Sequence, residues 1–128
     1  MAEEAIKKLN LTVLKRLDQE NDDILFRSRY SALHELDRAS KIWHACEKAG
    51  ALFIVKRKKE PKFKFFLLNQ KNNIDYSEEI FDGMKIEVKF EENFIFFETK
   101  KKIINGLWVN EKEELLSLEK TIRNLFKN

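Results

Sequence analysis

The stretch KKKIINGLWVNEKEELLSLEK, residues 100–120, joins an alternating strand pattern directly to a helical pattern. Successive side chains of a strand point to opposite faces, so Leu107 and Val109 share one face of a strand predicted over residues 103–109. Both look like core residues, and Trp108 is therefore expected to point the other way, toward solvent or a groove. An outward tryptophan is typical of recognition surfaces, because its ring is apolar and its N–H can donate a hydrogen bond.

The helical part of the same stretch begins at Asn110. Glu113 lies three residues further on, which is the spacing of a capping box. Apolar residues then recur at helical spacing at Leu115, Leu118, Ile122 and Leu125. The pattern predicts one amphipathic helix over residues 110–127 that closes the domain.

Before this stretch, from about residue 29, short apolar runs alternate with small polar breaks. They predict strands over residues 30–37, 41–46, 51–57, 62–68, 84–90, 94–98 and 103–109. The segment around residues 74–81 reads as a short edge strand or a turn. Most breaks have hairpin length, so neighbouring strands are expected to pair antiparallel.

The N-terminal segment, residues 3–19, carries a helical stripe. Its members are Ile6, Leu9, Val13 and Leu17. The stripe is expected to dock on the strands, with Leu11 and Leu14 partly off that face. Those two residues are either buried by a broader stripe or left as an apolar edge for a partner.

The predicted order is therefore helix, about seven antiparallel strands, helix. This order is typical of an α+β, mainly β fold, the pleckstrin-homology-like barrel, in which a C-terminal helix plugs one open end. We expect a single domain over residues 1–128, with a helix over 1–20, strands over 29–109 and the closing helix over 110–127. Fold alone says little about function.

Composition narrows the class of protein. The chain is 43% apolar and has eleven phenylalanines, which favours a packed domain over disorder. Its net charge of +3, from 25 basic and 22 acidic side chains, is too even to imply nucleic-acid binding by itself. A single cysteine, Cys46, excludes an internal disulfide, and the first ten residues lack a signal-peptide pattern. We expect a cytoplasmic or nuclear protein without a membrane-spanning segment.

The residues give no catalytic, metal or cofactor motif. Three glycines cannot build a glycine-rich phosphate loop, and no serine lies in a nucleophile elbow. The only soft metal ligands are His34, His44 and Cys46, whose spacing matches no common zinc pattern. Carboxylates are plentiful, but most fall in turns or on helix faces. The sequence therefore favours a binding protein over an enzyme, with no metal and no cofactor.

Two features point to surfaces instead. Lysines cluster at residues 56–64 and 100–102, which are either solvated turns or a phosphate-binding rim for RNA or a lipid headgroup. Trp43, Phe94 and Trp108 are either core residues or parts of a recognition surface. Strand alternation favours recognition for Trp108.

Five segments together resemble one family. They are NLTVLK (10–15), SALHELDRASKIW (31–43), KAGALFIVKR (48–57), FFLLNQ (65–70) and NGLWVNEKEELLSL (105–118). In this order they resemble the decapping protein 1 family over roughly residues 9–126. Members of that family are non-catalytic subunits of the mRNA-decapping enzyme, and their domain is of the EVH1 type within the pleckstrin-homology-like group.

The resemblance implies a groove of aromatic rings that binds proline-rich peptides of decapping enhancers. Such peptides arrive already extended as polyproline II helices, so little ordering entropy is lost. The groove residues of the family fall on Trp43, Phe94, Trp108 and His34. His34 departs from the tyrosine that is usual there, and Ala49 stands where the family has glutamate before glycine.

The resemblance also implies a partner for the N-terminal helix. In the family this helix helps to bind the regulatory domain of the catalytic subunit, a Nudix hydrolase, and Leu11, Leu14 and Lys15 are the candidates here. The chain lacks the Nudix signature, so it resembles the activator of cap removal in cytoplasmic processing bodies. Contact with mRNA is expected to be indirect or weak. The alternatives are a phosphoinositide-binding pleckstrin-homology domain and a stand-alone RNA-binding module.

Overall fold

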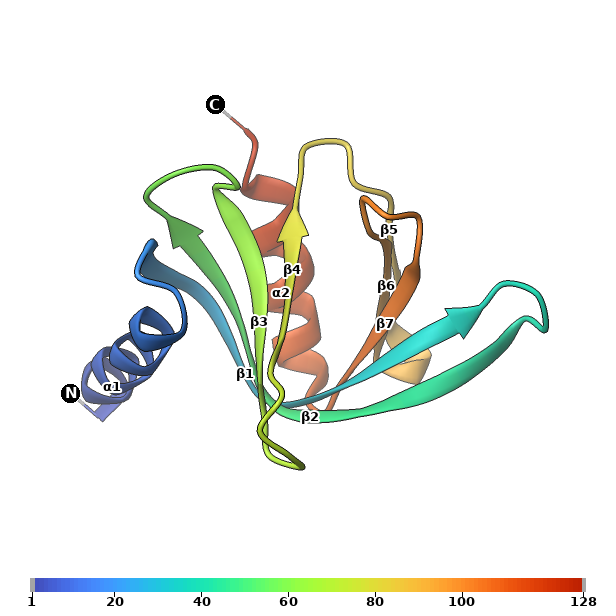
Figure 1. Cartoon of the computed structure of the whole chain (residues 1–128), viewed down its shortest axis with the longest axis horizontal. Helices are drawn as coiled ribbons and strands as arrows, with labels where there is room; N and C mark the ends of the chain where they lie inside the picture. Colours follow the sequence, from blue (N-terminus) through green and yellow to red (C-terminus); the bar gives the residue numbers. More distant parts are fainter. Residues whose placement is uncertain (1, 128) are drawn as a thin grey trace.

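The computed structural model describes residues 2–127, so the two ends of the predicted domain, residues 1 and 128, lie outside the described residues. Two helices flank one strongly curved antiparallel sheet (Figure 1). The elements in chain order are α1 (Ala2–Leu17), β1 (Asn21–Asp37), β2 (Ile42–Arg57), β3 (Phe63–Asn69), β4 (Tyr76–Ile80), β5 (Ile86–Lys89), a 3-10 turn (Phe90–Glu92), β6 (Phe94–Glu98), β7 (Ile104–Val109) and α2 (Lys112–Asn124). The predicted order of helix, seven strands and helix is confirmed.

The first strand lies in the middle of the sheet. The strand order is β4-β3-β2-β1-β7-β6-β5, so β1 pairs with both β2 and the last strand, β7. This pairing curls the sheet around α2, which lies between its two halves (Figure 1). α2 contributes Leu115, Leu118 and Ile122 to the inner core. The closing helix therefore plugs the barrel as predicted.

Strand boundaries differ from the prediction in two places. The strands expected at 41–46 and 51–57 form one strand, β2, because the segment between them is a bulge in which Glu47 has a left-handed φ of 58°. β1 begins at Asn21, nine residues before the predicted start at 30. Its polar first residues pair with β2, since Asn21 lies opposite Arg57 and Asp23 opposite Lys56. The polar residues of this segment hide the strand in the sequence, because Asp22 is exposed and Asn21 is buried with its side chain hydrogen-bonded to α1.

The sheet is covered on both faces near β2 and β3. Phe65 and Leu67 of β3 point into the inner core, whereas Phe66 between them joins an outer cluster with Phe53 and Val55 of β2. A strand buried on both faces reads as a continuous apolar run, which explains FFLL and ALFIV in the sequence. α1 packs against this outer cluster.

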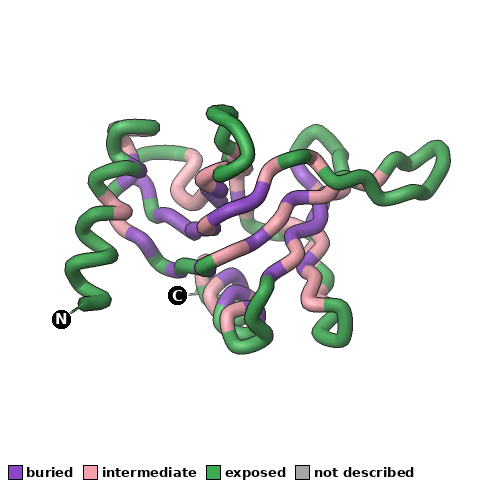
Figure 2. The backbone as a smooth tube through the Cα atoms, turned by 90° about the horizontal axis from the view of Figure 1, so that it is seen from below, coloured by how far each residue is buried: buried purple, intermediate pink, exposed green. Residues whose placement is uncertain are grey.

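The sequence prediction for α1 is wrong about which face docks. Leu14 is 0% exposed and lies in the outer cluster, with Leu11 packed beside it. Asn21 Nδ2 donates to the Leu14 carbonyl at 2.9 Å and fixes this end of the helix. The predicted docking stripe faces solvent instead, and most of α1 is exposed in Figure 2. Its members and exposed fractions are Ile6 38%, Leu9 69%, Val13 40% and Leu17 47%.

The predicted capping box of α2 is also wrong. Glu111, not Asn110, occupies the position before the first turn, and its side chain makes no capping hydrogen bond. The Asn110 N–H instead donates to the Tyr30 carbonyl at 3.1 Å. Glu114 accepts a hydrogen bond from the Arg29 N–H at 3.2 Å, so the first turn of α2 is tied to β1 rather than to itself. Neither helix is long and apolar enough to cross a membrane, within residues 2–127.

Candidate functional site

A set of aromatic rings lies on the outer face of four strands. We call it the aromatic row, and its members are Tyr30, His34, Trp43, Phe94, Phe96 and Trp108. Trp43 packs on Phe96 with ring centroids 4.9 Å apart and an interplanar angle of 33°. Phe96 and Phe94 are stacked at 5.3 Å and 7°. The His34 ring meets Phe94 edge-on at 5.2 Å, and Trp108 meets Tyr30 edge-on at 6.3 Å.

Cross-strand register brings these rings together. Trp108 on β7 lies opposite Phe94 on β6 and opposite Ala32 on β1. In the next row, Gly106 lies between Phe96 and His34. Residues directly opposite one another on antiparallel strands share a face of the sheet. The row therefore runs across β6, β7 and β1, and the long β1–β2 hairpin adds Trp43.

Gly106 makes room for the stacked rings. A Cβ atom at this position would lie 3.0 Å from the Phe96 ring and 3.3 Å from the Trp43 ring. A side chain at this position would force the two rings to shift, so its absence lets both lie this close over β7. Sequence reasoning missed Gly106, Phe96 and Tyr30. The signal for Phe96 was its spacing of two from Phe94, and Tyr30 shares the face of His34 by the same alternation.

The rings are accessible. Trp43 is 39% exposed, and Phe94, Trp108 and His34 are half-buried. Leu107 and Val109 are both 0% exposed, so Trp108 points away from the core as alternation predicts. The structure thus places all four predicted groove residues on one surface. Their role in binding remains a prediction.

Charged residues frame one end of the aromatic row. Arg38, in the β1–β2 hairpin, donates to Glu98 of β6 at 2.6 Å, and this hydrogen bond holds the pKa of the Glu98 carboxyl below its usual value. Backbone N–H groups of Ser40 and Ala39 lower the pKa of Asp37 in the same hairpin. These contacts order the hairpin that carries Trp43.

His34 differs from the other rings because it has two ring nitrogens. Its Nδ1 is buried and has no hydrogen-bond partner among the residues that the structure describes. The imidazole packs edge-on against Phe94 and has a flat face, but it lacks the phenol hydroxyl of a tyrosine. Its contribution to a bound ligand therefore differs from that of tyrosine.

The residues predicted to bind a catalytic subunit do not share one surface. Leu14 is fully buried, Leu11 is half-buried against the outer cluster, and Lys15 is exposed. Leu14 is therefore a packing residue and is not accessible to a partner in this conformation. The accessible apolar side of α1 is the stripe of Ile6, Leu9, Val13 and Leu17, which we call the outer stripe.

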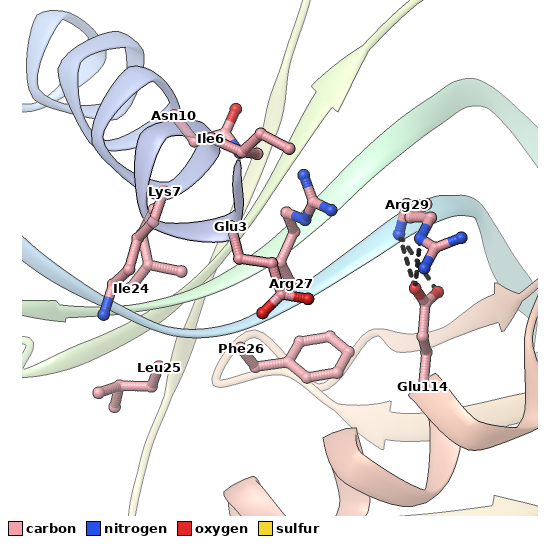
Figure 3. A pocket seen from close by; sticks show the side chains of 10 residues that line it. All are labelled: Glu3, Ile6, Lys7, Asn10, Ile24, Leu25, Phe26, Arg27, Arg29 and Glu114. Atoms are coloured by element: carbon pink, nitrogen blue, oxygen red, sulfur yellow. Dashed lines mark hydrogen bonds and ion pairs between the residues drawn. The ribbon is translucent and has the colours of Figure 1, made fainter. Parts of the chain in front are cut away.

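A groove of about 330 Å³ lies between α1 and β1 (Figure 3). Ile6, Lys7 and Asn10 line it from the helix, and Leu25 and Arg27 line it from the strand. At its far end Arg29 pairs with Glu114 of α2, with Nε and Oε2 3.7 Å apart. The groove continues the outer stripe onto the sheet and enlarges the surface that a partner of α1 would meet.

The described part of the chain holds no group of three or more His, Cys, Asp or Glu side chains placed to bind a metal ion. Burial raises the pKa of the Cys46 thiol, which keeps it protonated and weakens it as a ligand. The aromatic row itself offers flat apolar faces suited to stacking and to apolar contact.

Comparison with known proteins agrees with this geometry. The Dcp1-like decapping family model matches residues 6–124. An mRNA-decapping enzyme-like protein of Arabidopsis thaliana is 29% identical over 106 residues, which are 83% of this chain and 28% of that protein. The mRNA-decapping enzyme 1 of Caenorhabditis elegans is 26% identical over 116 residues, 91% of this chain and 34% of that protein. The chain thus spans about a third of the length of these curated relatives.

Solved structures show the same fold. The Dm DCP1 EVH1 domain, determined in complex with the XRN1 DBM peptide, superposes with a TM-score of 0.84 at 25% identity and covers 98% of this chain and 92% of that one. The crystal structure of Dcp1p gives a TM-score of 0.83 at 21% identity, covering 93% and 97%. A Ran-binding domain of Nup2 from Ashbya gossypii gives 0.67 at 18% identity, covering 82% and 95%. The predicted EVH1-type, pleckstrin-homology-like fold is confirmed.

Proposed function

Because this chain belongs to the Dcp1-like decapping family, whose model matches residues 6–124, we propose that it acts in mRNA decapping as a non-catalytic activator subunit. It binds proline-rich peptides of decapping enhancers through the aromatic row. It binds the catalytic Nudix subunit through α1. The result is faster removal of the 5′ cap, in the cytoplasm and its processing bodies.

The aromatic row is the observation that carries this proposal. Its neighbouring rings lie 4.9–5.3 Å apart from Trp43 to His34, so they form one surface rather than isolated aromatic side chains. A polyproline II peptide loses little entropy on binding and presents flat proline rings to such a surface. The EVH1 domain of Dm DCP1, which is 25% identical to this chain, was determined with a bound peptide, and this supports the assignment.

His34 adjusts the proposed peptide site. Replacing the family's tyrosine removes a hydroxyl that can donate to a peptide carbonyl, and the imidazole supplies a different hydrogen-bonding geometry. We expect the preferred peptide to differ from that of relatives at the residue that lies over His34, while the stacking positions at Trp43 and Trp108 are retained.

The proposed contact with the catalytic subunit shifts from the residues first predicted. Leu14 holds α1 on the sheet, so the outer stripe, together with exposed Lys15, is the surface that a partner meets. Four apolar side chains exposed along one helix form a typical protein-binding face. Activation would follow from a higher affinity for the closed, competent state of the hydrolase than for its open state.

Reconstitution tests the proposal. The chain and the catalytic subunit are co-purified, and decapping of a capped RNA is measured with and without the chain. We expect complex formation and a turnover number that rises more than the RNA affinity does. Failure to form the complex would contradict the proposal, and an effect confined to RNA affinity would identify a simple RNA clamp instead.

A further inference from the structure

Two lysine-rich turns, far apart in the sequence, lie at the same end of the barrel. They are the β2–β3 turn, residues 58–62, and the β6–β7 turn, residues 99–103. The pairing of Phe63 with Ile80 places the end of β4 beside the β2–β3 turn, and the ion pair between Lys100 and Glu79, 3.0 Å long, joins the β6–β7 turn to the same strand end. The C-terminal end of α2 emerges there too (Figure 1). We call this part of the molecule the basic end.

Most lysines of the basic end are not neutralised. Lys100 pairs with Glu79 at 3.0 Å. Among residues 2–127, no carboxylate lies within ion-pair distance of Lys56, Lys58, Lys59, Lys62, Lys64, Lys101 or Lys102. All of them are exposed or half-buried. Their charges are therefore available to an external anion.

Arg57 gives the β2–β3 turn a fixed shape. Its guanidinium pairs with Asp18 at 2.9 Å and is only 8% exposed. The same group donates to the carbonyls of Lys59 at 3.2 Å and Pro61 at 2.8 Å. Because Arg57 is occupied in this way, it organises the turn and leaves ligand contact to the lysines. A site ordered in advance loses less entropy on binding.

Lysines of both turns lie close to the end of β4. Burial raises the pKa of Glu78 on β4, while Lys101 from one turn and Lys64, which follows the other, both oppose that rise. Lys100 also lies over the ring of Phe81, 5.4 Å from its centroid. The lysines of the two turns therefore flank the end of β4 from both sides and form one positively charged rim.

A hollow of about 320 Å³ lies at the same end, between the β4–β5 loop and α2. Phe81, Met84, Phe126 and Lys127 are among the residues that line it. Phe126 is 39% exposed and is held edge-on against Phe63, with centroids 5.4 Å apart. Aromatic faces beside a basic rim are the usual combination in proteins that bind single-stranded nucleic acid.

We propose that the basic end binds single-stranded RNA, with the lysines of the two turns contacting phosphates and the hollow at Phe81 and Phe126 receiving a base. The inference rests on the proposed function, since it gives the decapping activator a contact of its own with mRNA. Lysine is a point-charge phosphate binder, which suits a flexible strand. Glu60, Asp82 and Glu119 also lie in this part of the molecule. Their negative charges would repel an anionic membrane surface laid flat on the basic end, whereas a flexible single strand can pass between them.

The test measures fluorescence anisotropy of a labelled single-stranded oligouridine with the chain alone, over a range of salt concentrations. The variant Lys59→Gln/Lys101→Gln removes one charge from each turn. The control Lys8→Gln/Lys89→Gln makes the same change in net charge at exposed positions outside the basic end. Removing one lysine–phosphate interaction should lower the salt slope by about 0.7, so the test variant should lower it by up to about 1.4 and the control should leave it unchanged.

A second variant tests the base site. Phe126→Leu keeps an apolar side chain at the hollow but removes the stacking face, and it should weaken oligouridine binding about fivefold or more. Binding of an oligomer that lacks bases should not change. The proposal is overturned if test and control variants lose equal affinity, or if wild-type chain binds phosphatidylcholine–phosphatidylserine vesicles but not oligouridine.

The outcome can be separated from that of the proposed function. The lysine variants keep the aromatic row and the outer stripe, so they should still bind proline-rich peptide and the catalytic subunit. Loss of RNA binding with these interactions intact supports the inference. Wild-type chain that binds both protein partners but no oligouridine overturns the inference and leaves the proposed function standing.

Discussion

Trp43 on β2 and Phe96 on β6 pack ring on ring with centroids 4.9 Å apart, although two strands separate theirs in the sheet. They meet above Gly106 of β7, where a Cβ atom would lie within 3.0–3.3 Å of both rings. One residue without a side chain thus joins the hairpin that carries Trp43 to the rest of the aromatic row. This contact forms one end of the series of packed rings, from Trp43 to His34, in the proposed peptide site.

Gly106→Ala should separate the two rings. An aromatic pair contributes about 0.5–1.5 kcal/mol beyond its buried area, so affinity for a proline-rich peptide should fall roughly two- to tenfold. Isothermal titration would measure the change. Gly83→Ala is the matched control: a Cβ there meets no neighbouring atom, but φ is +84°, so it should cost about 1–2 kcal/mol of stability and leave peptide affinity unchanged. Equal peptide affinities for Gly106→Ala and wild type would contradict the role of the stacked pair.

Trp108→Ala and Leu107→Ala change adjacent residues on opposite faces of β7. Trp108→Ala should reduce peptide affinity by about 30-fold or more, as expected for a central aromatic contact, and should change stability by about 1 kcal/mol. Leu107→Ala should cost about 2–5 kcal/mol of unfolding free energy, because it leaves a cavity in the inner core. Denaturant titration and peptide titration of both variants would show the two effects. A Trp108→Ala protein with wild-type affinity would exclude the aromatic row as the peptide site.

Leu14→Ala and Leu9→Ala separate packing from partner binding on α1. Leu14 is fully buried, so its truncation should cost about 2–5 kcal/mol and release the helix from the sheet. Leu9 is 69% exposed, so Leu9→Ala should change stability by no more than about 0.5 kcal/mol. It should nevertheless weaken capture of the catalytic subunit in a pull-down. If Leu9→Ala were strongly destabilising and Leu14→Ala were not, the outer stripe rather than Leu14 would pack α1 against the sheet.

Asp18 links stability to pH. Burial favours its neutral form, but hydrogen bonds from the Glu20 N–H and the Arg57 guanidinium outweigh this and hold the pKa of Asp18 below 3.8. A lowered folded-state pKa contributes stability above the unfolded value, and this contribution is lost as pH falls through the folded-state pKa. Asp18→Asn should therefore cost about 1–3 kcal/mol at neutral pH, and the difference from wild type should shrink below about pH 3.8. A difference that stayed constant with pH would show that the carboxylate charge is not the cause.

Strand alternation was enough to predict the facing of Trp108, because a period of two fixes which neighbours share a face. The membership of the aromatic row was only partly predictable. Phe96 meets Trp43 through the register between β6 and β7 and through the small size of Gly106, and neither is visible in periodicity. His34, Trp43 and Phe94 were assigned to the groove through resemblance to a family, not through spacing.

The orientation of α1 shows a different limit. Periodicity groups Ile6, Leu9, Val13 and Leu17 on one face, and that grouping is right. It does not say which apolar face meets the sheet when a helix has two. The choice depends on the outer cluster of Phe53, Val55 and Phe66, and an apolar run buried on both faces does not reveal which of its residues face outward.

β1 extends from the foot of α1 to the hairpin that carries Trp43, so a single strand spans both proposed protein-binding surfaces (Figure 1). The two surfaces lie at different places along it, and a ligand at one does not occupy the other. A peptide on the aromatic row and a catalytic subunit on α1 can therefore be bound at the same time, as a ternary complex. A catalytic subunit with its own proline-rich tail would then hold itself in place by two linked contacts, each raising the effective concentration of the other.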